Sequence, residues 1–396
     1  MLAGGLGTQL ELDLQALGSL TCSRTMARIL VAMSGGVDSS VAAARLLAAG
    51  HEVVGVTLHL WDYPPDGGVK GRCCAPEDVY DASRVASQLG IAHYTFDRRD
   101  HFRRAVVDPF VDAYLEGTTP NPCVHCNRQV KVPELLHLAD AMGASAVATG
   151  HYARILDVGG RLQLHRGLDP LKDQSYFLYA LRQEQLQRLI FPLGDAKKAE
   201  VRSEALRLGL HAADKGESQE LCFVDSGRYD QFVRERADGR LRPGLIVDAE
   251  GRAVGQHQGI HQFTLGQRRK LGTSVGRRAY VTALEPDTAT VRLGHYGELA
   301  RDWALLGDVV FEQDEPLPTE VDCVIRYRGS VQRARFERAG DGVRVTFEAP
   351  VAAVVPGQFA VAYQATRLLG GGRIIETGTG REQLQAVSSA VDSVGS

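Results

Sequence analysis

A loop rich in glycine and serine near the start of the chain has the composition of a phosphate-binding site. It reads SGGVDSS over residues 34–40, between an apolar run that predicts a strand and an Ala/Leu-rich run that predicts a helix. Glycines let the backbone approach a ligand closely, and a helix N-terminus offers N–H groups and a positive dipole end. The order matches neither G-x-x-x-x-G-K-S/T nor G-x-G-x-x-G. We therefore expect an anion cradle of another class, with an ordinary glycine-rich turn as the structural alternative.

A Cys-x-x-Cys pair could supply a nucleophilic thiolate. Cys123 and Cys126 follow two prolines and open a predicted helix, with Arg128 and Lys131 close behind them. A helix N-terminus and nearby cations favour the thiolate form of cysteine. A zinc site and a thioredoxin-like redox pair are the alternatives, although a Cys₄ zinc site would need a second pair.

The other cysteines are less informative on their own. Cys73 and Cys74 are adjacent rather than spaced as C-x-x-C, which weakens the zinc interpretation. Cys222 lies in an apolar run, and composition alone favours a core residue there. The chain is long, it contains seven cysteines, and its N-terminus does not have the pattern of a signal peptide. These features together are typical of a protein in a reducing compartment. We therefore expect a cytoplasmic protein.

Seven motifs together resemble the tRNA-specific 2-thiouridylase family (MnmA type) of PP-loop ATP pyrophosphatases. In chain order they are SGGVDSS, TPNPCVHCN, ATGHYAR, LDPLKDQSYFL, ESQELCF, HQGIHQFTLGQRRKLG and AVVPGQFAV. The resemblance spans about Met26 to Glu376. The first motif alone is shared with NAD, GMP, argininosuccinate and lysidine synthetases and with other tRNA thiolases, whereas the later ones are particular to this family.

The resemblance implies ATP chemistry on tRNA. In this family ATP adenylates O2 of the wobble uridine, which converts a poor leaving group into an AMP ester. Mg²⁺ would offset the charge of the triphosphate, and we assign it no protein ligand. The residues expected to contact the nucleotide are Ala32, Met33, Ser34, Gly35, Gly36, Val37, Asp38, Ser39, Leu58 and Gly150.

Sulfur would reach the enzyme as a persulfide from a sulfur-relay or cysteine desulfurase protein. The resemblance implies that Cys222 carries the terminal sulfur and that Cys126 attacks this persulfide, or pairs with Cys222 afterwards as a disulfide. The target base would lie near Asn121, Pro122 and Cys123. The best-described form of the family has Asp where this chain has Cys123, and that Asp is assigned proton transfer. A thiol cannot copy a carboxylate, so His125 or water could take this role, and Cys123 could compete with Cys222 for Cys126.

The resemblance also implies tRNA contacts along the chain. They fall on His151, Lys172, Asp173, Gln174, Arg326, Tyr327 and Gln358. Local charge agrees, because residues 261–284 contain five Lys or Arg and no acid, and residues 326–338 contain five Arg and one Glu. Such patches suit a phosphate backbone, with solvated basic loops as the alternative. The target base would have to leave the anticodon stack to reach the cysteines.

Predicted strands and helices alternate around the first motifs. Strands are expected at 28–33, 53–60, 91–96 and 145–149, and helices at 37–49, 76–89, 101–115, 132–142, 174–190 and 197–208. The helix over 101–115 should kink at Pro109, and Gly159-Gly160 predicts a β-hairpin turn. The alternation predicts an α/β fold with a doubly wound parallel sheet, which gathers the loops at the carboxyl ends of the strands in one crevice.

After residue 228, short β-type runs separated by Gly and Pro predict small β-domains or a barrel. We expect a disordered leader over 1–25 (Met26 reads like a natural start), a PP-loop catalytic domain over 26–228, a central β-rich tRNA-contacting domain over 229–298, a C-terminal β-barrel over 299–380 and a disordered tail over 381–396.

Composition narrows the class of protein. A chain of 396 residues predicts two or three domains. An apolar content of 44% and a charged content of 23% exclude a disordered chain, a collagen-like fibre and a coiled-coil rod. The sequence contains no run of 18 uncharged apolar residues, so we predict no transmembrane helix. The net charge of −3 excludes a globally basic nucleic-acid coat protein.

Two other functions remain as alternatives. A PP-loop ligase acting on a small molecule, such as an amidating or argininosuccinate-type synthetase, would need no redox-active cysteines and would release pyrophosphate without tRNA. A zinc-stabilised RNA-binding module would bind stoichiometric zinc and turn over no ATP.

Overall fold

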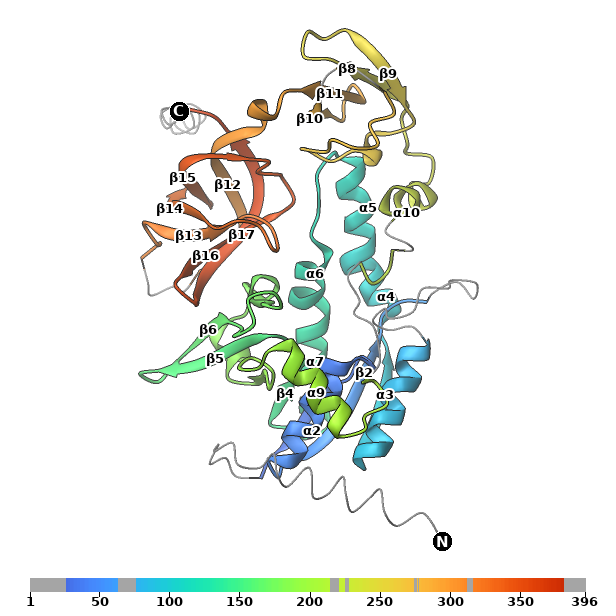
Figure 1. The fold of residues 1–396 in the computed structure, drawn as a ribbon, viewed down its shortest axis with the longest axis vertical. Helices are drawn as coiled ribbons and strands as arrows, with labels where there is room; N and C mark the ends of the chain where they lie inside the picture. The colour runs from blue at the N-terminus through green and yellow to red at the C-terminus, as the bar shows by residue number, and fades with distance from the viewer. Residues whose placement is uncertain are drawn as a thin grey trace, which may run out of the picture. The chain divides into compact units, whose positions relative to one another are not determined.

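The computed structural model describes residues 26–62, 76–213, 221–224, 228–273, 276, 278–311 and 316–380 (Figure 1). The chain divides into two compact units. The first runs to Asp108 and takes in Pro122–Tyr229 and Thr366–Leu368, whereas the second takes in Pro109–Asn121, Asp230–Ala365 and the residues from Leu369 onward.

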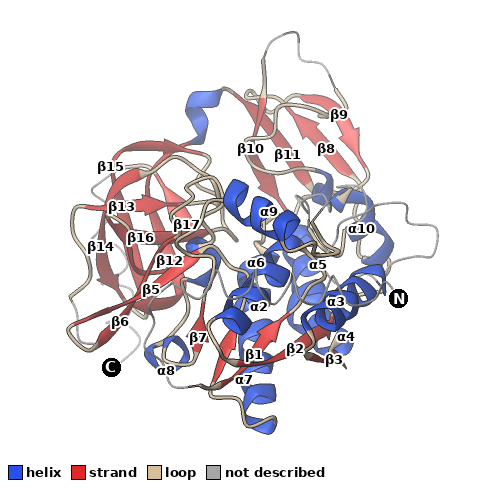
Figure 2. Ribbon diagram, turned by 60° about the horizontal axis from the view of Figure 1, so that its bottom comes forward, coloured by secondary structure: helices blue, strands red, loops and turns tan. Residues whose placement is uncertain are grey.

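A five-stranded parallel sheet forms the centre of the first unit (Figure 2). In spatial order its strands are β3 (Ala92–Asp97), β2 (Glu52–His59), β1 (Arg28–Ala32), β4 (Ala146–Ala148) and β7 (Leu189–Ile190). All neighbouring pairs run parallel. The chain order reverses between β1 and β4, and this switch point is where open α/β sheets bind their ligands. The predicted fold class is confirmed.

Helices complete the parallel-sheet layer. They include α2 (Val37–Ala48), α3 (Pro76–Leu89), α7 (Val132–Ala141) and α9 (Lys198–Arg207). Ile29 and Val31 share a core with α2, α3 and α9, whereas α7 contacts β1 and β4. The Ala/Leu-rich α2 begins with Asp38 in its first turn and has Arg45 in its last, which suits the helix dipole.

Two π-helical segments precede prolines. The expected helix over 101–115 consists of α4 (Arg99–Phe102), the π-helical η1 (Arg103–Val107) and α5 (Asp108–Leu115). A second π-helical segment, η2 (Cys126–Lys131), separates α6 (Pro122–His125) from α7. Pro109 and Pro133 lack an N–H to donate to the preceding turn, so the wider turn lies just before each of them.

The predicted helix over 174–190 is wrong. That stretch holds a 3₁₀ turn, η3 (Ser175–Leu178), a short helix α8 (Gln183–Leu186) and strand β7. Leu189 and Ile190 pair with Val147 and Ala148 of β4, so extension of the sheet overrides local helix propensity. The predicted hairpin is confirmed as β5 (Ala153–Val158) and β6 (Arg161–Arg166), with both turn glycines at positive φ.

The second unit contains a four-stranded sheet and a closed barrel. In spatial order the strands of the sheet are β10 (Tyr280–Glu285), β11 (Thr290–Gly294), β8 (Gly244–Val247) and β9 (Ala253–His257). In spatial order the strands of the barrel are β12 (Ala300–Phe311), β15 (Gly342–Ala352), β14 (Gln332–Ala339), β13 (Val321–Val324), β16 (Phe359–Gln364) and β17 (Arg367–Gly378). The barrel is closed because β12 pairs with β17. The sequence did not predict the helix α10 (Tyr229–Arg236), because only short β-type runs are expected after residue 228.

No helix in the described ranges is long and apolar enough to cross a membrane.

Candidate active site

The phosphate loop follows the carboxyl end of β1 and is braced by its own serines. Ser39 Oγ accepts a hydrogen bond from Ser34 N–H at 3.1 Å and donates to Gly36 O at 3.1 Å. Ser40 Oγ donates to the same carbonyl at 2.8 Å and is fully buried. These hydroxyls therefore shape the loop, and the first-turn N–H groups of α2 are the donors that a helix start offers to an anion.

The other predicted nucleotide contacts lie on the neighbouring strands. Ala32 ends β1, and Met33 N–H donates to Val56 O of β2 at 2.8 Å. Leu58 is buried near the end of β2, where it pairs with Phe96 of β3. The predicted residues thus sit at the carboxyl edge of the sheet; their contact with ATP stays a prediction.

Two glycines allow close approaches at the loop. Gly35 has φ +69°, and a Cβ there would lie 2.2 Å from the backbone oxygen of Asp78 in α3. A Cβ on Gly150, which follows β4, would lie 2.9 Å from Ser39 N. Neither position accepts a side chain without backbone movement. The structure therefore brings Gly150 to the loop from the other side of the switch point.

Asp38, the carboxylate of the loop, receives two donors from elsewhere in the first unit. Tyr152 Oη donates to Asp38 Oδ1 at 2.7 Å, and Lys198 Nζ lies 2.7 Å from both carboxylate oxygens. Sequence reasoning misses both donors. The ATGHYAR motif contains Tyr152 and could have pointed to it, whereas Lys198 contacts Asp38 across 160 positions and carries no local signal.

The helix with the Cys-x-x-Cys pair presents its two thiols differently. Cys123 is exposed and Cys126 is buried. Cys126 is also the first residue of the π-helical η2, which contacts α4 and η3. Pi-helical turns occur often at functional sites, and here the predicted nucleophile Cys126 is part of such a turn.

Cys222 is held in place by the residue that follows it. The Phe223 ring is 3% exposed, and its centroid lies 5.7 Å from Phe102 and 6.1 Å from Trp61. Phe102 belongs to α4, the helix that η2 also contacts. Both cysteine-bearing segments are therefore anchored on α4. The rest of the ESQELCF motif, residues 217–220, lies outside the described residues, as do Cys73 and Cys74.

His151 is a neutral imidazole beside the cysteine segment. Its Nδ1 lies 2.7 Å from Thr149 Oγ1. Burial, followed by the nearby Lys131 cation of η2, lowers the pKa of His151 to about 3. At neutral pH the imidazole is therefore uncharged, so the predicted tRNA contact of His151 would be a hydrogen bond rather than an ion pair.

The predicted tRNA contacts at Lys172, Asp173 and Gln174 directly precede η3. Asp173 is buried. Its carboxylate accepts hydrogen bonds, each at 3.1 Å, from Gly167 N–H, Ser175 N–H, Ser175 Oγ and Arg166 Nη1. Gln174 Oε1 accepts from Tyr152 N–H at 3.0 Å. The Asp173 and Gln174 side chains thus position this turn, and η3 contacts α6 and η2.

Gln358 contacts the backbone that leads into the predicted target-base segment. Its Nε2 donates to Thr119 O at 2.9 Å, and Thr119 N–H donates to Pro356 O at 3.0 Å. The barrel loop before β16 therefore holds the backbone just ahead of Asn121, which is 9% exposed.

The basic stretches of the second unit are exposed. Arg326 is exposed, and the Arg328 guanidinium lies 5.2 Å from the centre of the Tyr327 ring. Along β14 the exposed Arg333 and Arg335 alternate with the buried residues of the barrel core. Arg268, Arg269 and Lys270 are also exposed, whereas Arg277 lies outside the described residues.

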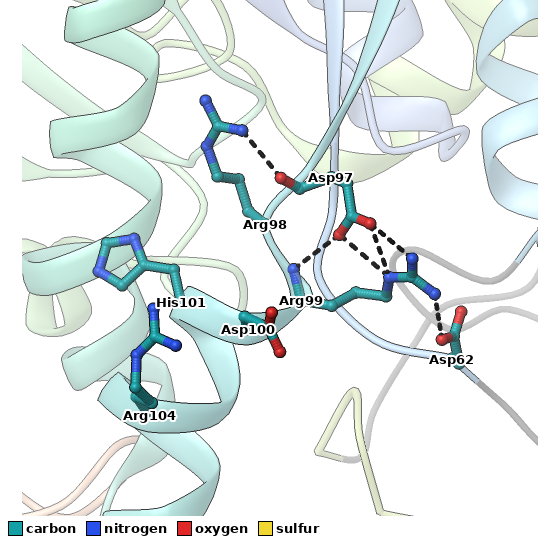
Figure 3. A pocket seen from close by; sticks show the side chains of 7 residues that line it. All are labelled: Asp62, Asp97, Arg98, Arg99, Asp100, His101 and Arg104. Carbon is teal, nitrogen blue, oxygen red and sulfur yellow. Dashed lines mark hydrogen bonds and ion pairs between the residues drawn. The ribbon is translucent and has the colours of Figure 1, made fainter.

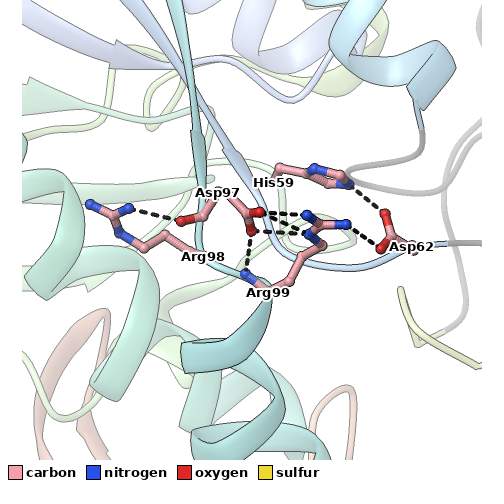
Figure 4. Close-up of polar contacts among 5 residues, drawn as sticks. All are labelled: His59, Asp62, Asp97, Arg98 and Arg99. Atoms are coloured by element: carbon pink, nitrogen blue, oxygen red, sulfur yellow. Dashed lines mark hydrogen bonds and ion pairs between the residues drawn. The ribbon is translucent and has the colours of Figure 1, made fainter.

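A charged cavity of about 610 Å³ lies at the carboxyl end of β3 (Figure 3). It is lined by Asp62, Asp97, Arg98, Arg99, Asp100, His101 and Arg104. Arg99 binds both Asp97 and Asp62 (Figure 4). The Arg99 guanidinium holds the pKa of Asp97 well below its usual range. In the sequence, most residues that line this cavity come from the charged run DRRDHFRR over 97–104, which directly follows the predicted strand over 91–96.

The same cluster fixes the start of α4. Arg98 Nε donates to Glu134 Oε2 at 2.6 Å, and His101 Nδ1 lies 2.9 Å from Glu134 Oε1. Because Glu134 belongs to α7, these contacts tie α4 to the helix that continues from η2. The orientation of Phe102, and with it the anchor for Cys222, depends on this turn.

Within the described ranges, no group of three or more His, Cys, Asp or Glu side chains could hold a metal ion.

Family models match three successive parts of the chain. A model described as the tRNA methyl transferase HUP domain matches residues 27–226. A tRNA methyl transferase PRC-barrel domain matches residues 230–295, and an Aminomethyltransferase beta-barrel domain matches residues 304–374.

Curated relatives match the chain over most of its length. The tRNA-specific 2-thiouridylase MnmA of Sorangium cellulosum (strain So ce56) is 57% identical over 354 residues, which cover 88% of this chain and 92% of that protein. The protein of the same name from Carboxydothermus hydrogenoformans (strain ATCC BAA-161 / DSM 6008 / Z-2901) is 46% identical over 356 residues, which cover 88% and 97%.

Proposed function

The chain belongs to the tRNA-specific 2-thiouridylase family, and on that premise we propose that it catalyses ATP-dependent 2-thiolation of the wobble uridine of tRNA. The observation that carries the proposal is the shared anchoring of the two predicted sulfur-handling cysteines. Cys126 begins a segment packed on α4, and Cys222 precedes a phenylalanine packed on the same helix. The phosphate loop lies in the same unit.

The first step is adenylation. Uridine O2 bonds to the α-phosphorus of ATP while the bond from that phosphorus to the bridging oxygen breaks. The electron pair leaves with pyrophosphate, and the uridine N3 proton is released. The loop at the N-terminus of α2 binds the phosphates through backbone N–H groups.

The second step is sulfur transfer. Cys126, as a thiolate, attacks the Cys222 sulfur of the persulfide, which forms the Cys126–Cys222 disulfide and releases hydrosulfide. Hydrosulfide attacks C2 of the adenylated uridine and expels AMP. A thiol reductant then restores both cysteines. The persulfide sulfur comes from a sulfur-relay or cysteine desulfurase protein, and the reaction takes place in the cytoplasm.

Mg²⁺ fits this site as the counter-ion of ATP rather than as a resident metal. Mg²⁺ bound to nucleotides takes one or two carboxylates together with phosphate oxygens and waters. Asp38 is the carboxylate of the loop that could contact it. When bound, the ion neutralises charge on the triphosphate.

Mass spectrometry of the wobble nucleoside tests the function. The protein is incubated with tRNA, Mg-ATP and a persulfide source, and we expect 2-thiouridine at position 34 only when all components are present. Pyrophosphate release without tRNA, and without thiolation, would instead support a small-molecule ligase.

A further inference from the structure

A buried amide oxygen lies directly beside the predicted nucleophile. Asn127 follows Cys126 in η2 and is 5% exposed. Its Oδ1 is buried and has no hydrogen-bond partner among the residues that the structure describes. A buried acceptor without a partner costs folding free energy, and such groups are rare in folded proteins. Asn127 thus presents an acceptor to a donor that the described residues do not supply.

The side chain of Asn127 belongs to the buried face of its helix. Val124 and Val130, three positions before and after it, are almost fully buried, and residues three apart share a helix face. The other carboxamide of η2, Gln129, is exposed. Burial of a polar group between apolar neighbours is costly, so packing alone would favour an apolar residue at position 127.

The proposed reaction brings the target base to this segment. Hydrosulfide released between Cys126 and Cys222 attacks C2 of the uracil, so C2 must come close to these sulfurs. N3, which is bonded to C2, carries a hydrogen, and O4 lies beside it on the same edge of the ring. This edge therefore offers a donor next to an acceptor. A carboxamide offers the complementary pair, with Oδ1 as the acceptor and Nδ2 as a donor.

We propose that Asn127 binds the target uracil, with Oδ1 accepting from N3–H and Nδ2 donating to O4. This inference rests on the proposed function, because it needs the wobble base to reach the cysteine segment. The ring is rigid, so this pairing also fixes O2, which ATP adenylates, and C2, which hydrosulfide attacks. An amide oxygen is too weak a base to keep the N3 proton that adenylation releases. Asn127 therefore orients the base and leaves proton transfer to another group.

Wobble bases with and without an N3–H test this contact. The full chain is titrated with tRNA that carries uridine or 3-methyluridine at position 34, in the presence of α,β-methylene-ATP, which cannot adenylate. In the wild type we expect the methyl group to weaken binding roughly tenfold or more, because it removes the hydrogen bond and crowds a buried amide. In N127A the same methyl group should weaken binding less than about twofold, because its partner is gone and space is left for it.

Two further variants keep the test decisive. Gln129 is the matched control, and Q129A should show the wild-type penalty for 3-methyluridine. N127S also shortens the side chain and replaces N127A if that variant does not fold. Equal penalties in the wild type and in the Asn127 variants would overturn the inference. So would equal binding of the two tRNAs by the wild type.

Steady-state kinetics separate this inference from the proposed function. N127A should lower kcat/KM for tRNA in pyrophosphate release roughly ten- to hundredfold. KM for ATP should stay within about twofold of the wild type, because the phosphate loop is unchanged. Wild-type protein that binds tRNA and the ATP analogue but releases no pyrophosphate from ATP would defeat the proposed function. An N127A enzyme with wild-type kcat/KM for tRNA would defeat the role of Asn127 alone.

Discussion

Asp38 joins three parts of the first unit at one carboxylate: the phosphate loop, the turn after β4 and the start of α9. Its partners Tyr152 and Lys198 both lie 2.7 Å away. Asp38→Ala removes the anchor for the lysine and should reduce tRNA-dependent pyrophosphate release to background. Ser34→Ala should do the same, because it removes a hydroxyl that lies 3.3 Å from Ser39 Oγ. Normal release by either variant, folded as judged by its melting curve, would contradict the assignment of the loop to ATP.

Tyr152→Phe should reduce activity less than Asp38→Ala does. It removes one hydrogen bond to a carboxylate and leaves the ring and the lysine in place, so about 1.5 kcal/mol or more should be lost. The expected decrease in kcat/KM for ATP is at least about tenfold. A decrease as large as that of Asp38→Ala would show that the tyrosine has a direct part in the reaction.

Serine substitutions of Cys222, Cys126 and Cys123 should have different effects on the reaction. Cys222→Ser should adenylate tRNA but form no thiolated nucleoside, because serine cannot carry a persulfide. Cys126→Ser should load persulfide on Cys222 and release little of it. The exposed Cys123 should tolerate serine well. The readouts are AMP-tRNA, persulfide labelling of Cys222 and 2-thiouridine.

The opposite pattern would identify another pair. If Cys222→Ser kept full thiolation while Cys123→Ser lost it, the reaction would use Cys123 and Cys126 alone. The working site would then be confined to one turn of helix, and the anchoring of both segments on α4 would have no part in it.

At the scale of elements, the contact between the end of β4 and the start of α2 determines the shape of the loop. Gly150→Ala would place a Cβ 2.9 Å from Ser39 N, so one of the two backbones must move. We expect KM for ATP to rise at least tenfold with little change in tRNA affinity. Gly297→Ala is the control because a Cβ there meets no atom within 4 Å. Unchanged ATP kinetics in Gly150→Ala would show that the loop does not need this close approach.

At the scale of the whole molecule, buried histidines predict sensitivity to mild acid. Burial lowers the pKa of His93, His165, His257 and His261, and it lowers that of His151 to about 3. Unfolding restores ordinary values, so the unfolded chain binds more protons below pH 6.5. The stability is therefore present above pH 6.5 and is lost as the pH falls towards the folded values.

Melting temperatures at pH 7.5, 6.5 and 5.5 check this prediction. We expect little change between the first two and a fall of several degrees at the third. The lowered pKa of Asp97 adds a loss only in more acidic solution, below about pH 4. A melting temperature that stays constant down to pH 5.5 would contradict the prediction.

The local features of this protein could be read from its sequence. The loop over 34–40, the Cys-x-x-Cys helix and the alternation that builds the parallel sheet all depend on neighbours a few positions apart. Glycine and proline conformation, helix starts and apolar periodicity act at that range. The predicted strands and α3 therefore match the structure closely, and a π-helical turn lies directly before Pro109, where a kink was expected.

Contacts between distant segments were decided only by the tertiary structure. Lys198 reaches Asp38 across 160 positions, and Gln358 reaches Thr119 across 239. No local pattern encodes either pair, because each forms only after separate elements have packed. The stretch 174–190 shows the same principle within the backbone. Its sequence favours a helix, but pairing with β4 at the sheet edge and burial of Tyr176 and Leu178 stabilise a different conformation.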